Sequence, residues 1–74
     1  MKTDVAAEMS RRVIEIMGLL DSSVHFVQEN CTEEEFKVLR LSIGKVMGKL
    51  VIEVMNPLYA NNPEVKPPEY EDYE

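Results

Sequence analysis

The residues whose types could support chemistry are few in this 74-residue chain, and the first is its single histidine, His25. His25 and Glu29 are four residues apart, so on a helix they share a face and could hold a metal ion, with four ligands in a symmetric dimer. The helical H-E-x-x-H pattern is absent, and no carboxylate or nucleophile is placed to complete a triad with His25. The sequence therefore predicts no catalytic residue, no metal site and no cofactor.

The single cysteine, Cys31, falls between two predicted helices. One cysteine cannot form an intrachain disulfide, and with one histidine it cannot supply the usual ligands of structural zinc. A lone thiol in so small a chain suits a reducing compartment. We expect Cys31 to fill a turn, where exposure would still allow disulfide-linked dimers on oxidation.

The third candidate is a short motif near the C-terminus, Pro67-Pro68-Glu69-Tyr70. Its pattern, Pro-Pro-x-Tyr, resembles the ligands of WW domains, which bind such segments as polyproline II helices. Pro67, Pro68 and Tyr70 would be the binding residues under that resemblance. The alternative is a stiff acidic spacer that keeps the protein in solution, and this is the interpretation we favour.

Two helices must position these residues. The first is predicted over about residues 4–29, with apolar residues at spacings of three and four along one face. These residues are Val5, Met9, Val13, Ile16, Met17, Leu20, Val24 and Val27. The second is predicted over about residues 33–55, with Thr32 and Glu35 forming a capping box and Pro57 disfavouring helix at Asn56.

The short connection between these helices predicts an antiparallel hairpin over residues 1–56. Folding about Cys31 places Ile43 across from Leu20 and Leu50 across from Val13. Arg40 falls within the apolar arc of the second helix. We expect its charge either to extend into solvent or to pair with Asp21 or Glu29.

The second helix has more apolar surface than one neighbour can cover. Its apolar and glycine positions span an arc of roughly 240°, whereas packing on one side needs little more than about 100°. The positions left over are Leu41, Gly44, Gly48, Ile52 and Met55. The two glycines indicate close backbone approach, although tolerated exposed glycine is the alternative. We predict that this line forms a dimer interface in a homodimeric four-helix bundle.

Charge and composition limit the function classes. The net charge is −6, and the eight basic residues are scattered, which argues against nucleic-acid binding. No segment is apolar enough to span a membrane or to form a signal peptide, so we expect a cytoplasmic protein. Residues 57–74 carry one lysine against five acids and all four prolines. They are predicted to form one short turn and then an extended or disordered tail.

Three hypotheses for function follow from these features. The first is a non-enzymatic homodimeric module that binds an unidentified protein or regulates it. The second is an obligate subunit of a larger assembly, in which another protein covers the second helix. The third, ranked last, is a metal-binding or enzymatic dimer with its site at the interface.

Overall fold

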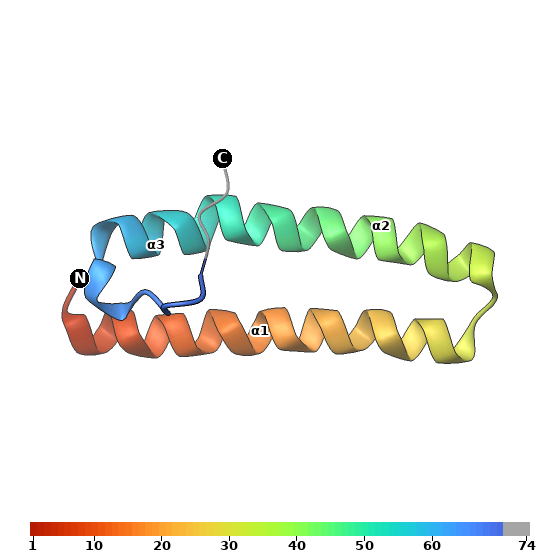
Figure 1. Ribbon diagram of the computed structural model, residues 1–74, viewed down its shortest axis with the longest axis horizontal. Coiled ribbons are helices and arrows are strands. Elements are labelled where there is room, and N and C mark those ends of the chain that lie inside the picture. Colours follow the sequence, from red (N-terminus) through yellow and green to blue (C-terminus); the bar gives the residue numbers. More distant parts are fainter. Residues whose placement is uncertain (71–74) are drawn as a thin grey trace.

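The computed structural model describes residues 1–70, and over this range all regular structure is helical. Helix α1 (Thr3–Asn30) and helix α2 (Glu33–Leu50) run antiparallel, which confirms the predicted all-α hairpin (Figure 1). The second arm continues as a π-helical turn, η1 (Val51–Met55), and a short helix, α3 (Asn56–Asn61). A 3-10 turn, η2 (Pro63–Val65), follows.

The turn between the long helices is closed by hydrogen bonds at both helix ends. The Cys31 N–H donates to the Val27 carbonyl at 2.9 Å. The Glu35 N–H donates to Thr32 Oγ1 at 3.2 Å, and the Thr32 N–H donates to Glu35 Oε1 at 3.0 Å. This reciprocal pair is the predicted capping box, and it satisfies backbone donors that the helix cannot pair internally.

A short turn was predicted after the second helix, and α3 lies at that place, but the predicted break before Pro57 is absent. Asn56 keeps helical angles (φ −58°, ψ −49°), and its N–H bonds to the Val51 carbonyl five residues earlier. In a regular α-helix the ring of Pro57 would clash with the carbonyl of Glu53. A π turn is wider than an α turn, so the carbonyls before Pro57 are spaced differently and the clash can be avoided. The helix therefore continues past the proline.

The π turn also changes which side chains face the hairpin. It holds one more residue than an α turn, so the residues after it are rotated by about 100°. Leu41 and Tyr59 are 18 residues apart, about five turns, and would share a face on an unbroken α-helix. Instead, Leu41 is 64% exposed and Tyr59 is 2% exposed. The rotation brings Tyr59 into the core.

The core lies at the open end of the hairpin, away from the Cys31 turn. The buried apolar residues are Ala6, Val13, Val51, Met55, Leu58 and Tyr59. Two buried polar residues are also satisfied there. The hydroxyls of Ser10 and Tyr59 share a hydrogen bond of 2.6 Å, and Asn62 Nδ2 donates to the Leu58 carbonyl at 2.9 Å. One small core therefore lies at this end, enclosed by α1, by η1 with α3, and by the segment that follows α3.

The segment after α3 folds back against α1 (Figure 1). Thr3 Oγ1 donates to Glu64 Oε1 at 3.3 Å, and Tyr70 packs against the core cluster. This corrects the prediction of an extended or disordered tail for residues 63–70. The prediction overlooked Tyr70, whose ring has an apolar partner in Tyr59. Residues 71–74, which belong to the same predicted tail, lie outside the described residues.

The half of the hairpin nearer the turn is built differently. Between residues 14 and 50 no residue is fully buried. The two helices meet there along one line of half-buried side chains, here called the seam. In this half the seam consists of Met17, Leu20, Val24 and Val27 on α1 and Phe36, Leu39, Ile43, Met47 and Leu50 on α2. Two helices alone cannot cover both sides of such a line.

Candidate functional site

The chemistry-bearing residues of α1 lie apart from one another on an exposed surface. His25 Nε2 lies 3.7 Å from Asp21 Oδ2, and both side chains are largely exposed. Within residues 1–70 no three His, Cys, Asp or Glu side chains are close enough to share a metal ion. Cys31 is exposed at the turn.

Arg40 does not adopt the ion pair considered from the sequence. Its guanidinium lies over the ring of Phe36, 5.7 Å from the centroid. Asp21, one of the two expected partners, lies beside His25 instead. A planar cation over an aromatic face is weakly favourable at an exposed site and keeps the charge in water. Arg40 therefore covers part of the turn half with its own side chain.

An exposed ion-pair network on α1 was not found by sequence reasoning. Glu8 Oε2 lies 2.6 Å from Arg11 Nη2 and 2.7 Å from Arg12 Nε. Arg11 also reaches Glu15 at 3.2 Å. The hydrogen bonds from Arg11 and then Arg12 lower the pKa of Glu8 to about 2. The spacings of three and four residues were the available signal, and ion pairs at these spacings stabilise a helix.

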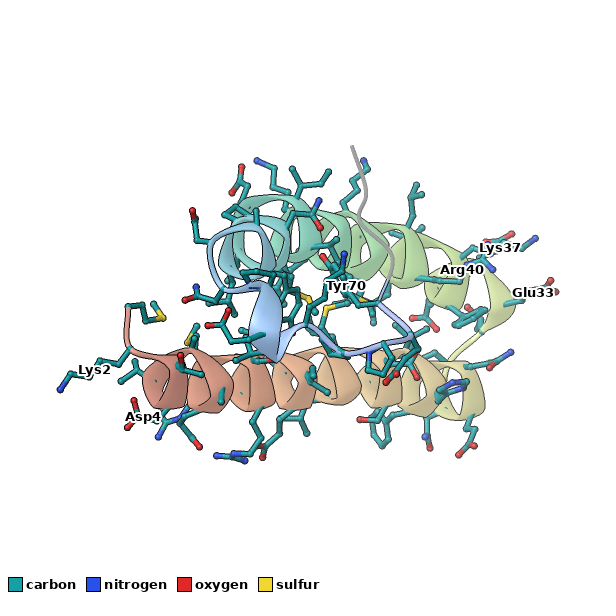
Figure 2. All side chains as sticks on the ribbon, turned by 60° about the vertical axis from the view of Figure 1, so that its left-hand side comes forward. Lys2, Asp4, Glu33, Lys37, Arg40 and Tyr70 are labelled. Carbon is teal, nitrogen blue, oxygen red and sulfur yellow. The ribbon has the colours of Figure 1, made fainter. Side chains whose placement is uncertain are left out.

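The proline-rich motif is held in a turn. The Tyr70 N–H donates to the Pro67 carbonyl at 3.1 Å, closing a β-turn over the motif. The Tyr70 ring meets that of Tyr59 edge to face at 4.7 Å, and its hydroxyl donates to Asn56 Oδ1. Figure 2 shows Tyr70 between the two arms of the hairpin. A WW domain needs an extended segment, so docking would first require this turn to detach.

The predicted interface line is only partly at the surface. Leu41 is 64% exposed and Ile52 is 48% exposed, and a Cβ added at Gly44 or Gly48 would meet nothing within 4 Å. The prediction that Met55 belongs to this line is wrong, because Met55 is 6% exposed and belongs to the core. The π turn rotates it off the line. The glycines make no close approach within this chain, so their role in an interface stays a prediction.

The two sides of the hairpin can be told apart by the hollows beside the turn. One hollow, of about 530 Å³, includes Val38 and Ser42 with the seam residues Val27 and Leu39. The other includes Gln28, Lys37 and Arg40. The first set contains residues one position before a seam residue, and the second contains residues one position after. On both helices, therefore, a residue one position before a seam residue lies on the side of the first hollow. A residue one position after a seam residue lies on the side of the second.

The side before the seam carries large exposed apolar side chains on both helices, mostly on α1, with polar residues between them on α2, and we call it the apolar flank. Its large exposed side chains are Val5, Met9, Ile16, Leu19 and Phe26 of α1 and Val38 and Val46 of α2. The opposite side, the tail flank, carries the folded-back segment and several polar residues. The single apolar face predicted for the first helix combines Val5, Met9 and Ile16 with the seam residues. Their position one residue before Ala6, Ser10 and Met17 was the signal that two lines run along α1.

Neither protein-family models nor curated proteins nor solved structures give a match to this chain. None of the helices within residues 1–70 has the length and apolar character needed to cross a membrane.

Proposed function

We propose that this chain is a non-enzymatic protein-interaction module whose working form is a homodimeric four-helix bundle. The observation that carries the proposal is excess surface. A compact monomer of this mass exposes about 4,700 Å². This chain exposes 5599 Å². The difference, about 900 Å², is close to the roughly 800 Å² that each partner buries in a standard interface.

The elongated shape supports the same proposal. The radius of gyration is 14.4 Å, against about 11 Å for a compact domain of this length. The half of the hairpin nearer the turn accounts for the extra length, and seam residues such as Leu20 and Ile43 are half-exposed there. A second hairpin packed beside the first would bury these residues, since four-helix bundles cover their seams on both sides. Small chains without disulfides or metals are commonly stabilised in this way.

The acidic surface fits an interaction role. The net charge of −6 favours approach to basic protein surfaces and disfavours nucleic acid. The alternative function, an obligate subunit of a hetero-complex, shares the same uncovered surface. The two functions predict different behaviour of the purified chain, which would form a folded homodimer in the first case and would be unfolded without its partner in the second.

Sedimentation equilibrium over a range of about 1–500 μM, with thermal unfolding at each concentration, tests the proposal. A twofold mass and a melting temperature that rises with concentration are expected, because association stabilises the folded state by mass action. A cooperatively melting monomer throughout the range would overturn the proposal. A chain that is unfolded alone and folds only with another protein would also overturn it, in favour of the obligate subunit.

A further inference from the structure

We propose that the second copy docks on the apolar flank, with the two hairpins antiparallel, so that the turn of each lies over the open end of the other. This inference rests on the proposed function and names its partner surface. It replaces the α2 line of Leu41, Gly44, Gly48 and Ile52 as the place of contact.

Coverage of the two flanks favours this surface. On the tail flank the open end is already covered by residues 63–70, with Tyr70 against Tyr59. The positions one after the seam in the turn half are mainly charged or small, and Ile14 is the large exposed apolar side chain among them. On the apolar flank both helices contribute large apolar side chains. A second copy there would cover the seam without displacing the tail.

The hollows along the apolar flank favour a partner of the same length. Near the turn the hollow is lined by Val27, Val38 and Leu39. At the open end a second hollow, of about 750 Å³, is lined by Met9, Val54 and Leu58 among others. Ile16 and Val46 lie between them, near the middle of α1 and of the hairpin. A twofold axis at this middle would let one partner of the same length cover both hollows.

Charge favours the antiparallel orientation. Glu34 and Glu35 line the hollow at the turn. A parallel dimer would bring these acids together from both copies, and like charges facing each other across an interface are unfavourable. The basic residues of the flank, Arg12 and Lys49, lie toward the middle and the open end. An antiparallel pairing separates the two acidic turns by the length of the hairpin, 45 Å. Each turn then lies opposite the open-end hollow, where the acid in the lining, Glu53, is paired with Lys49 at 4.0 Å.

Two isoleucines provide a matched test of the surface. Ile14 and Ile16 are both 46% exposed, lie two residues apart on α1, and face opposite flanks. Ile16→Lys is expected to weaken dimerisation at least about 100-fold by sedimentation equilibrium, because it places an unpaired charge in the interface. Ile14→Lys is expected to change it less than about threefold. Far-UV circular dichroism of both variants checks that helix content is retained.

Leu41→Lys separates failure of the surface from failure of the proposed function. If the parent chain is monomeric at every concentration, the proposed function and this inference fall together. If the parent chain is dimeric but Leu41→Lys or Ile14→Lys weakens the dimer as much as Ile16→Lys does, the apolar flank is overturned while the dimer stands.

The orientation can be measured with the chain's own cysteine. Cys31 is exposed at the turn, and a spin label there reports the distance between the two turns in a dimer. An antiparallel dimer is expected to give about 40 Å, the length of α1 at about 1.5 Å per residue. A distance below about 20 Å, or rapid disulfide formation within the dimer, would overturn the antiparallel arrangement.

Discussion

The two ends of the hairpin differ in what encloses them. At the open end Val13 and Tyr59 are 1% and 2% exposed, because α1, the π turn with α3, and the folded-back segment surround them. At the turn end Leu20 and Ile43 have similar apolar side chains and remain half-exposed. The difference shows that the number of enclosing segments decides burial here, since two helices in contact leave two open sides.

The largest expected effect comes from removing Tyr59, the residue that organises the enclosed end. Tyr59→Ala is expected to cost about 3–5 kcal/mol, enough to abolish cooperative folding in a domain of this size. Ile43→Ala is expected to cost clearly less, because its side chain is only half-buried. Urea unfolding followed by circular dichroism, in the Ile16→Lys background to remove dimer effects, gives the comparison. A larger loss for Ile43→Ala would contradict the contrast between the ends.

Hydrogen exchange tests the same contrast without a substitution in the core or in the seam. In the Ile16→Lys variant, amides of residues 38–46 are expected to exchange at least about tenfold faster than those of residues 54–58. Local opening is easier where few apolar contacts are lost. In the parent dimer the protection of residues 38–46 is expected to rise. Equal protection of the two segments in the variant would show that the turn half needs no further cover.

A smaller effect is expected at Tyr70, which covers one side of the enclosed end. Tyr70→Ala removes the edge-to-face contact with Tyr59 and the hydrogen bond to Asn56, at an expected cost of about 1–2 kcal/mol. Tyr70→Phe keeps the ring contact and is expected to lose less. Thermal unfolding of both variants measures the difference. If Tyr70→Ala left stability unchanged, the folded-back segment would not contribute to the core.

The smallest expected effect is a dependence of stability on pH. The pKa of Glu8 is lowered in the folded chain from 4.5 to about 2 by Arg11 and Arg12. Its ion pairs therefore stabilise the fold above about pH 4.5, and this contribution is lost as pH falls toward 2. Glu35, whose pKa is lowered by hydrogen bonds from Thr32, acts in the same direction at the turn.

Thermal melts between pH 2 and 7 test these two acids separately. Glu8→Gln and Glu35→Gln are each expected to flatten part of the pH dependence. Because both side chains are exposed, each shift in melting temperature should be small. A steeper dependence in either variant would contradict the direction of its pKa.

The predictable parts of this fold are those governed by local interactions. The capping box at Thr32, the short connection at Cys31 and the alternating spacings of three and four were sufficient to predict an antiparallel hairpin. Each depends on residues within about one turn of one another. The all-α class follows from them directly.

The parts that sequence reasoning missed depend on a balance between local and tertiary terms. Pro57 disfavours helix locally, yet burial of Met55 and Tyr59 favours continuing the arm, and a π turn accommodates both. The same turn removed Met55 from the predicted interface line. The apolar flank was missed because Ile16 and Met17 are neighbours in sequence and were assigned to one face. Only the position of α2 separates them.

The π turn has a consequence for how this chain can vary. Because one additional residue there sets the orientation of everything that follows, the segment between Leu50 and Tyr59 is constrained in length more strictly than in composition. Conservative replacements within it are expected to leave Tyr59 pointing inward. Inserting a single further residue would swing that ring toward water and leave the enclosed end without its centre.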